Sequence, residues 1–464
     1  MRIVLDLQAC QSASRFRGIG RYSMSFATEM VRQLVSRKHD VIVLLNENFL
    51  DMIGPVSTNL QNQVPDICFT SFRVPTPCAA GNPENGWRLR AAELLREHSI
   101  ACLEPDFVHV STLLADGWGD DTVASVGELG VSFPTALTHY DLIPLVMADV
   151  YMPEGPFRAH YLRKLESVKQ ADLLLAISEY SRQEALKWLE RSEDSVVNIS
   201  SAVNSDFAEQ SESLSDIDGV MARYELRPGF LLYAPGGFDF RKNLNRLIEA
   251  YASLPATLRE QHQLVIASKL CDGQREAWLR KAGDCGLVEG EMVLTDYVPD
   301  YDLIDMYRAC HAYVFPSLHE GFGLPVLEAM SCGAAVIASD CTSIPEAVGL
   351  PEALFNPRSV ESIAEKLQRV LTDTEFLARL KAHAKIQPSK FSWVRSAEVA
   401  VAAIEKKHHE LASGGYVPAS RSELPSCDSL IRMLEKSGCD VVPTENDIRQ
   451  FRECYTANYG IRYL

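Results

Sequence analysis

The sequence lacks the long apolar run of a membrane-spanning protein and the excess of basic residues of a nucleic-acid binder. No stretch of its 464 residues approaches the roughly 18 consecutive apolar residues that span a bilayer. Lys and Arg number 45 against 62 Asp and Glu, which gives a formal net charge of −17. Clustered cations hold nucleic-acid phosphates, so this balance argues against a nucleic-acid binder. It also disfavours broad adhesion to an anionic membrane, although one local patch could still dock.

The cysteines show no pairing pattern either. Twelve cysteines are scattered with no Cys-X-X-Cys and no neighbouring histidine pair, so neither a zinc site nor a disulfide framework is indicated. Residues 1–7 carry Asp6 within an apolar run and lack a cleavage site, which predicts a first strand rather than a signal peptide. We therefore expect a protein of the reducing cytoplasm.

Apolar runs recur along the chain with helical stretches between them, which is the alternation of an α/β protein. The runs are nearly continuous in apolar residues, as expected for parallel strands covered on both faces. A polar, Ser-rich and acidic passage at residues 204–219 separates two series of them. We therefore predict two doubly wound, Rossmann-like domains. The predicted strands are residues 3–5, 41–45, 107–110, 136–138 and 173–177, then 230–234, 264–267, 292–294, 312–315 and 335–338.

The most informative motif is a glycine loop between residues 317 and 333. It reads Ser-Leu-His-Glu-Gly-Phe-Gly-Leu-Pro-Val-Leu-Glu-Ala-Met-Ser-Cys-Gly, with seven residues between Glu320 and Glu328. The loop follows a predicted strand and leads into a helix at Pro325, whose positive end favours an anion such as a diphosphate. Four backbone N–H groups are expected to converge on the same anion, those of Gly321, Phe322, Gly323 and Leu324.

A second candidate for anion binding follows the predicted strand at 230–234. Residues 236–243 read Gly-Gly-Phe-Asp-Phe-Arg-Lys-Asn and open a helix that should end near Ala252. Two cations at a helix start oppose its dipole, so Arg241 and Lys242 are best explained by an anion between them. Together with the glycine loop and the backbone at Gly237, they would hold a diphosphate from two sides and stabilise its charge.

Residues 317–333 resemble, nearly letter for letter, the signature of retaining glycosyltransferases of family 4, which have the two-domain GT-B fold. The resemblance implies that a nucleotide-sugar donor binds the second domain, with Arg241 and Lys242 at its phosphates. It assigns Glu328 to the donor ribose and the backbone near Val298 to the base. It places Glu320 next to the transferred sugar, where binding of sugar hydroxyls is favoured over a role as covalent nucleophile. In many members the two cations lie several residues apart, whereas here they are adjacent.

Residues 17–22, which read Arg-Gly-Ile-Gly-Arg-Tyr, resemble the start of a subgroup of the same family. The resemblance implies that Gly18 and Gly20 let a loop approach the donor phosphate and the acceptor. A dinucleotide-binding fingerprint is the rival interpretation. It is disfavoured because Ser23 stands where the third glycine is needed and the loop after the first strand is too long.

Residues 138–144, Thr-His-Tyr-Asp-Leu-Ile-Pro, end another predicted strand. The family more often has His directly before Asp, whereas Tyr140 intervenes here. His139, Tyr140 and Asp141 therefore all stay candidates for the acting side chain, with His139 and Asp141 the ones we assign to catalysis.

We expect no metal ion and no cofactor besides the donor itself. Asp300 and Asp302 resemble the metal-binding pair of the other large glycosyltransferase fold, but charge at a helix start explains them. Arg241, Lys242 and helix amides would take the place of a metal.

The expected layout has four parts. Residues 1–205 form the acceptor-side domain and residues 206–388 the donor domain. Residues 389–412 form a helix that returns to the first domain. Residues 413–464 form a linker and tail, whose apolar and aromatic ending is typical of a chain that leads into a further domain.

These features predict a retaining hexosyltransferase that moves mannose from GDP-mannose onto a growing bacterial cell-surface glycan such as O-antigen. Its partners would be the nucleotide sugar and a glycan or lipid-linked oligosaccharide acceptor. Other assembly proteins would hold it peripherally at the inner face of the cytoplasmic membrane. The alternatives are a dTDP-rhamnose or UDP-glucose donor, a nucleotide-sugar epimerase or phosphorylase, and a non-catalytic sugar-nucleotide binding module.

Overall fold

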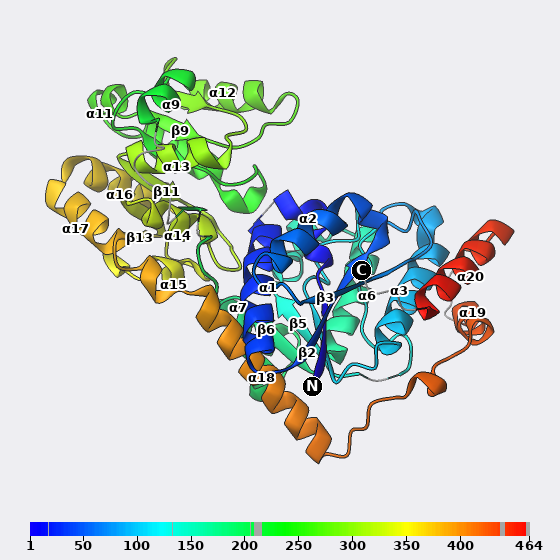
Figure 1. Cartoon of the computed structure of the whole chain (residues 1–464). Coiled ribbons are helices and arrows are strands. Elements are labelled where there is room, and N and C mark those ends of the chain that lie inside the picture. The colour runs from blue at the N-terminus through cyan, green and yellow to red at the C-terminus, as the bar shows by residue number, and fades with distance from the viewer. Residues whose placement is uncertain (17, 132, 205, 208–215, 437–440, 461–464) are drawn as a thin grey trace. The chain divides into compact units, whose positions relative to one another are not determined.

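The computed structural model describes residues 1–16, 18–131, 133–204, 206–207, 216–436 and 441–460 (Figure 1). The chain divides into two compact units. Unit 1 contains Met1–Ile177, Ser181–Ile199 and Trp393–Leu464, and unit 2 contains Ser178–Tyr180 and Ser200–Ser392. Among the described helices, none has the length and apolar character needed to cross a membrane.

Unit 1 is built on a parallel sheet of seven strands in the order β3-β2-β1-β4-β5-β6-β7. Leu5 on the central strand β1 pairs with Val43 on β2 and with His109 on β4. The strands are β1 (Arg2–Asp6), β2 (Asp40–Asn46), β3 (Cys68–Phe72), β4 (Phe107–Val110), β5 (Thr135–His139), β6 (Leu173–Ala176) and β7 (Val196–Asn198).

Helices cover both faces of this sheet, so its strand residues are largely buried. Two strands, β3 and β7, were not among the predicted ones. β3 lies at an edge and mixes apolar with polar residues, and β7 has three residues. The helices are α1 (Gly18–Ser36), α2 (Leu50–Gln61), α3 (Gly86–Ala101), α4 (Ile143–Val146), α5 (Ala148–Tyr151), α6 (Pro156–Gln170), α7 (Glu179–Trp188), α18 (Trp393–Ser413), α19 (Cys427–Lys436) and α20 (Glu445–Tyr459).

Helix α18 packs along α1 within unit 1. The ring of Trp393 at its start meets the ring of Tyr22 edge-on, with 4.9 Å between the ring centroids. Beyond the middle of the helix, Glu405 accepts hydrogen bonds from Arg37 at 2.7 Å and from His39 at 2.9 Å. The long helix after residue 392 is therefore part of the first unit.

We expected residues 413–464 to form a linker and tail, and the described part of them from α19 onward packs onto unit 1. Leu430, Leu434 and Phe451 are fully buried in the same hydrophobic core as the sheet. Helix α20 lies beside α3, as Figure 1 shows. The ring of Phe451 on α20 meets the ring of Trp87 on α3, with 6.0 Å between the ring centroids. The Asn458 side chain donates to the carbonyl of Arg73 at 2.8 Å and accepts from its N–H at 2.7 Å. It thereby satisfies backbone groups just beyond the edge strand β3.

Unit 2 is built on a second parallel sheet, of six strands in the order β10-β9-β8-β11-β12-β13. Counted from its first strand, the order is 3-2-1-4-5-6, that of doubly wound nucleotide-binding folds, and the first six strands of unit 1 share it. The predicted pair of Rossmann-like domains is therefore confirmed. The strands are β8 (Leu231–Tyr233), β9 (Leu264–Ile266), β10 (Met292–Leu294), β11 (Ala312–Phe315), β12 (Val336–Ser339) and β13 (Leu354–Phe355).

The helices of unit 2 connect these strands and cover the sheet. Only β13, with two residues, had no counterpart in the sequence prediction. The helices are α9 (Ile217–Arg223), α10 (Leu244–Ala252), α11 (Ala256–Gln261), α12 (Gln274–Asp284), α13 (Asp300–Ala309), α14 (Leu324–Ser331), α15 (Ile344–Val348), α16 (Val360–Thr372) and α17 (Thr374–Ala384).

Gly18 and Gly20 lie in the first turn of α1 rather than in an open loop. A Cβ atom at Gly20 would overlap the backbone of Ser14 and Arg15, whereas a Cβ at Gly18 would meet nothing within 4 Å. Gly20 is therefore required by close packing.

We expect Gly20→Ala to lower the free energy of unfolding by about 1–3 kcal/mol, because the neighbouring backbone must shift. The matched variant Gly18→Ala should change it by less than about 1 kcal/mol. Urea titration of both variants checks this, and equal stabilities would contradict it.

Candidate active site

The two predicted anion-binding loops of unit 2 come together at one point of its sheet. The strands β8 and β11 are neighbours, and the strand order reverses between them. Ligands of open parallel sheets bind at such a switch point, beyond the carboxyl ends of the strands. The loops that follow these strands are joined by a hydrogen bond from Leu318 N to Arg241 O at 2.7 Å.

Glu320 lies between the two cations that the sequence singled out. Lys242 Nζ is 2.7 Å from Glu320 Oε1, and Arg241 Nη1 is 2.7 Å from Oε2 of the same carboxylate. Arg241 Nη1 also donates to His319 O at 3.0 Å, and its Nε lies 3.2 Å from Asp239. We expected an anion between the two cations, and in this structure the carboxylate of Glu320 occupies that place.

The cluster is removed from solvent. Lys242 and Glu320 are each 8% exposed, and Lys242 Nζ also lies over the ring of Phe315, 5.8 Å from its centroid. Burial alone would raise the pKa of Glu320, but the charges of Lys242 and Arg241 outweigh it and lower this pKa to about 2. The pKa of Lys242 is lowered, first by burial and then by repulsion from Arg241, against the attraction of Glu320. Glu320 is therefore a carboxylate at any ordinary pH.

This ion pair makes the stability of the protein depend on pH. Because the folded pKa of Glu320 lies below its unfolded value near 4.5, the pair contributes fully above that value. Its contribution is lost as the pH falls toward about 2. Glu320→Gln should cost about 3 kcal/mol at pH 7, because two buried cations lose their partner. The gap between the variant and the parent should narrow as the pH falls from 5 to about 3.

Urea unfolding monitored by circular dichroism at several pH values measures this difference in unfolding free energy between the variant and the parent. Glu352→Gln is the control, because Glu352 pairs with Arg379 at the surface of unit 2, with 32% and 47% of the two side chains exposed. That substitution should cost less than about 1 kcal/mol at every pH. If the difference in unfolding free energy between Glu320→Gln and the parent grew as the pH fell, this would contradict the lowered pKa of Glu320.

The loop that carries Glu320 is fixed by groups that the sequence analysis did not identify. Glu320 N donates to Thr342 Oγ1 at 3.3 Å, and Ser343 Oγ donates to Glu320 O at 2.8 Å. Asn243 Nδ2 donates to Pro316 O at 2.9 Å and to Pro357 O at 2.8 Å. Asn243 also has a left-handed backbone, with φ of +61°, directly before α10. An Asn at a helix start was the available signal, whereas Thr342 and Ser343 follow β12 and have no local signature.

The glycine loop ends in α14 as predicted, with Pro in its first turn. Gly323 precedes the helix with φ of +103°, a value that favours glycine. Phe322 is 2% exposed and packs edge-on against Phe391, with ring centroids 5.5 Å apart. Leu324 is the first helical residue, and Gly321 lies in the loop before it. The N–H groups of this first turn lie where the anion site was predicted, and anion binding by them stays a prediction.

Glu328 lies within α14 and is 5% exposed. Burial raises the pKa of Tyr313 on β11 and of Cys332 after the helix, and the negative charge of Glu328 raises both pKa values further. Glu320 and Glu328 thus come from different elements, as the motif indicated. The assignment of Glu328 to a donor ribose stays a prediction.

The remaining donor-side candidates lie in loops after β8 and β10. Gly236 and Gly237 have φ of +68° and +147°, and a Cβ at either would meet nothing within 4 Å. Glycine is therefore favoured there by backbone conformation and not by space. Val298 is 9% exposed in the loop between β10 and α13. The contact of this loop with the base, which would use its backbone atoms, stays a prediction.

Unit 1 distinguishes the three candidates around residue 140. His139 ends β5, is 4% exposed, and burial lowers its pKa to about 4, so the imidazole is neutral near pH 7. The Tyr140 hydroxyl hydrogen-bonds with Ser23 Oγ at 2.7 Å and donates to Ser111 O at 3.1 Å. Asp141 accepts from Ile143 N at 3.1 Å at the start of α4. Tyr140 is therefore tied to α1 and to the residue that follows β4, and a catalytic role for His139 or Asp141 stays a prediction.

Comparisons with known proteins agree with this geometry. The profile described as "Glycosyl transferases group 1" matches residues 227–387, which include both loops. The chain is 37% identical over 402 residues to the serotype-specific mannosyltransferase WbdA of Escherichia coli, covering 86% of this chain and 47% of that protein. It is 33% identical over 261 residues to O-antigen chain mannosyltransferase B of Escherichia coli, covering 56% of this chain and 67% of that protein. The chain belongs to the group 1 glycosyltransferases.

This group 1 glycosyltransferase spans about half the length of WbdA. Among solved structures it resembles HepE from Anabaena, crystallised with UDP and glucose, with a TM-score of 0.61 and 17% identity. The match covers 88% of this chain and 100% of HepE. WaaG, a glycosyltransferase of lipopolysaccharide biosynthesis, matches with a TM-score of 0.59 and 16% identity. At these identities the likeness is one of fold, and it is the GT-B fold that the sequence indicated.

Asp300 and Asp302 of this glycosyltransferase lie in the first turn of α13. Asp302 accepts from Arg223 Nη1 at 2.5 Å and from the Tyr224 hydroxyl at 2.8 Å. Within the part of the chain that the structure describes, no three His, Cys, Asp or Glu side chains are grouped so that they could hold a metal ion. These contacts favour a structural role for Asp302.

Proposed function

We propose that the chain is a retaining mannosyltransferase that transfers mannose from GDP-mannose to a growing glycan of the O-antigen type. The observation that carries the proposal is the 37% identity over 402 residues to the mannosyltransferase WbdA. The Arg241–Lys242–Glu320 cluster supports it, because this cluster lies at the switch point of the second sheet. The buried cations there suit the diphosphate of a nucleotide sugar.

Lys242 would stabilise the departing diphosphate. An ammonium has three N–H donors, and Glu320 takes one of them, so the others can reach phosphate oxygens. The low dielectric around a buried cluster strengthens this attraction as charge develops on the leaving group. Helix α14 adds its positive end from the neighbouring loop. The chain's own groups thus offer the charge stabilisation that the bond cleavage needs.

Glu320 is poorly suited to act as a covalent nucleophile. Its carboxylate is shared between two cations at 2.7 Å, and its pKa is about 2, which makes it a weak base. We therefore favour attack by the acceptor hydroxyl on the same face of the sugar. The bond between the anomeric carbon and the phosphate oxygen breaks with its electron pair on the diphosphate. The diphosphate oxygen then accepts the proton of the attacking hydroxyl.

Incubation with GDP-mannose, UDP-glucose and dTDP-rhamnose, each with a short mannoside acceptor and a lipid-linked acceptor, tests the proposal. Mass spectrometry should show addition of one hexose from GDP-mannose only, and NMR should show an α-linkage, because a retaining transfer keeps the α-configuration of the donor. Transfer from another donor would replace mannose in the proposal. Free nucleotide without a longer glycan would favour an epimerase or phosphorylase, and binding without turnover a non-catalytic module.

A further inference from the structure

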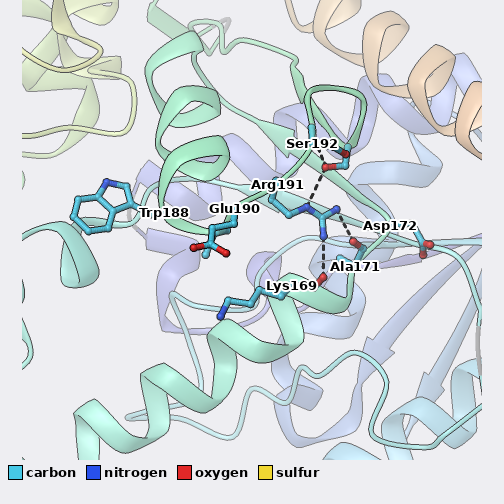
Figure 2. A pocket seen from close by; sticks show the side chains of 9 residues that line it. Lys169, Ala171, Asp172, Trp188, Glu190, Arg191 and Ser192 are labelled. Atoms are coloured by element: carbon cyan, nitrogen blue, oxygen red, sulfur yellow. Dashed lines mark hydrogen bonds between the residues drawn. The ribbon is translucent and has the colours of Figure 1, made fainter.

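A separate cavity of about 650 Å³ lies in unit 1, at the edge where the strands begin (Figure 2). Lys169 lies in the last turn of α6 and Asp172 directly before β6, while Trp188 ends α7 and Glu190 and Arg191 follow it. In proteins with open parallel sheets, reacting ligands bind at the opposite edge of the sheet, where the strands end. The volume falls within the range of about 300–1,000 Å³ that is typical of ligand sites. The cavity is therefore distinct from any reaction site at the ends of these strands.

Arg191 is fixed in the wall of this cavity. Its Nη1 donates to Lys169 O at 2.8 Å, its Nη2 to Ala171 O at 2.7 Å, and its Nε to Ser195 Oγ at 3.1 Å. Figure 2 shows the guanidinium bonded to the chain just before β6. A guanidinium has five N–H donors, so these three bonds leave two for a ligand. A donor pair that is already held in place costs little entropy when it binds.

The charges that line the cavity balance one another. Lys169 and Arg191 are cationic, and Asp172 and Glu190 are anionic. Burial raises the pKa of Asp172, and its Oδ2 accepts from Thr135 N at 2.8 Å. Lys169 is half exposed and pairs with Glu166 at 2.9 Å. A phosphate or a nucleotide would require a net positive lining, and an apolar ligand would leave the charged groups without partners. The lining suits a neutral ligand with many hydroxyl groups.

Trp188 adds an aromatic surface at the mouth. It is 42% exposed, and the Lys187 ammonium lies over its ring at 5.1 Å from the centroid, which restrains the indole. Figure 2 shows the indole beyond Glu190, on the side away from the Arg191 guanidinium. One sugar of a bound chain would pack its C–H face on the indole, while the hydroxyls of a neighbouring sugar bond the polar side chains.

We propose that this cavity is a second glycan site, which holds the growing polysaccharide away from the point of transfer. The choice of mannose as the bound sugar rests on the proposed function. A chain held at two points binds more tightly than at either alone, because the second contact is intramolecular. Long acceptors would therefore be retained between additions, whereas a single sugar would gain nothing from the site.

Binding of a linear α-linked mannotetraose in the absence of donor tests the site directly by isothermal titration or NMR. The parent protein should show saturable binding, and Trp188→Ala should weaken it about tenfold. Glu190→Ala, another exposed position, should also weaken it. Tyr459→Ala is the matched control, because Tyr459 is 43% exposed in unit 1 and does not line the cavity. No binding by the parent, or equal binding by Trp188→Ala and Tyr459→Ala, would overturn the proposal.

Transfer assays separate this result from the proposed function. With a methyl mannoside as acceptor, Trp188→Ala should keep the parent's kcat/KM, while with the tetraose its KM should rise and its products should be shorter. If the tetraose binds through Trp188 but mannose is never transferred, the second site stands and the proposed function fails. If mannose is transferred and the long acceptor is used equally by both proteins, the second site fails and the proposed function stands.

Discussion

Replacing Lys242 by methionine should lower kcat/KM for sugar transfer by about 100- to 1,000-fold, the size of effect seen when one preorganised charge-stabilising donor is removed. Lys242 is 8% exposed and already oriented by Glu320 at 2.7 Å, so no reorganisation is needed when charge develops. Methionine keeps most of the side-chain volume and removes the charge. The loss should fall mainly on kcat, because the attraction is strongest once the diphosphate departs.

Steady-state kinetics with the donor that the protein uses measures this effect. Lys281→Met is the control in the same unit, because Lys281 is 32% exposed and pairs with Glu249 at the surface. It should leave both kinetic constants unchanged. Lys242→Arg restores a cation without the same geometry and should recover part of the activity. A Lys242→Met protein that is folded by circular dichroism and has unchanged kcat would remove Lys242 from the proposed mechanism.

Replacing Arg96 by leucine should lower the free energy of unfolding by about 3–5 kcal/mol, because a buried carboxylate loses its partner. Arg96 on α3 donates through Nε to Asp6 Oδ2 on β1 at 2.6 Å, and both side chains are 1% exposed. Asp6 also accepts from Gln8 Nε2 at 3.0 Å, which cannot compensate a full charge. The pair fastens the helix to the central strand of the first sheet.

A double-mutant cycle tests this interpretation. Asp6→Leu alone should be about as destabilising as Arg96→Leu, while the double variant should be less destabilised than the sum of the two, because no charge is left buried without a partner. The surface pair Arg2–Asp40, with side chains 39% and 57% exposed, is the control. Asp40→Asn should change the free energy by less than about 1 kcal/mol. Additive single effects at Asp6 and Arg96 would show that the pair carries no coupling.

Much of the candidate site in unit 2 could be predicted from local sequence, because its parts are loops whose conformation follows local rules. A strand followed by glycines and a proline-started helix predicts an anion site wherever it occurs, and Gly323 and α14 have the expected form. Local sequence is less informative at Gly20, which lies in the first turn of α1. Two glycines before an apolar helix suggest a flexible loop, whereas the structure uses one of them for close packing of backbones. Nothing local distinguishes these two uses of glycine.

The packing of the tail and the cavity in unit 1 lay outside what sequence patterns could indicate. Helix α20 has polar residues on most positions, and it is recognisable as part of the core only because Phe451 meets Trp87 from a segment more than 350 residues away. The cavity beside Trp188 combines residues of α6 and α7 that belong to no known motif. Contacts of this kind depend on which surfaces the fold brings together.

The sequence by itself determined that the chain forms two parallel α/β units and that the glycine loop and the Arg-Lys pair are candidate anion-binding segments. Apolar periodicity and turn residues act over a few positions, so they can be read directly from neighbouring letters. The tertiary structure decided that Glu320 occupies the space between the two cations, that His139 is buried and neutral, and that the last helices complete unit 1. These features depend on strand order and on burial, which arise only when segments far apart in the chain pack against one another.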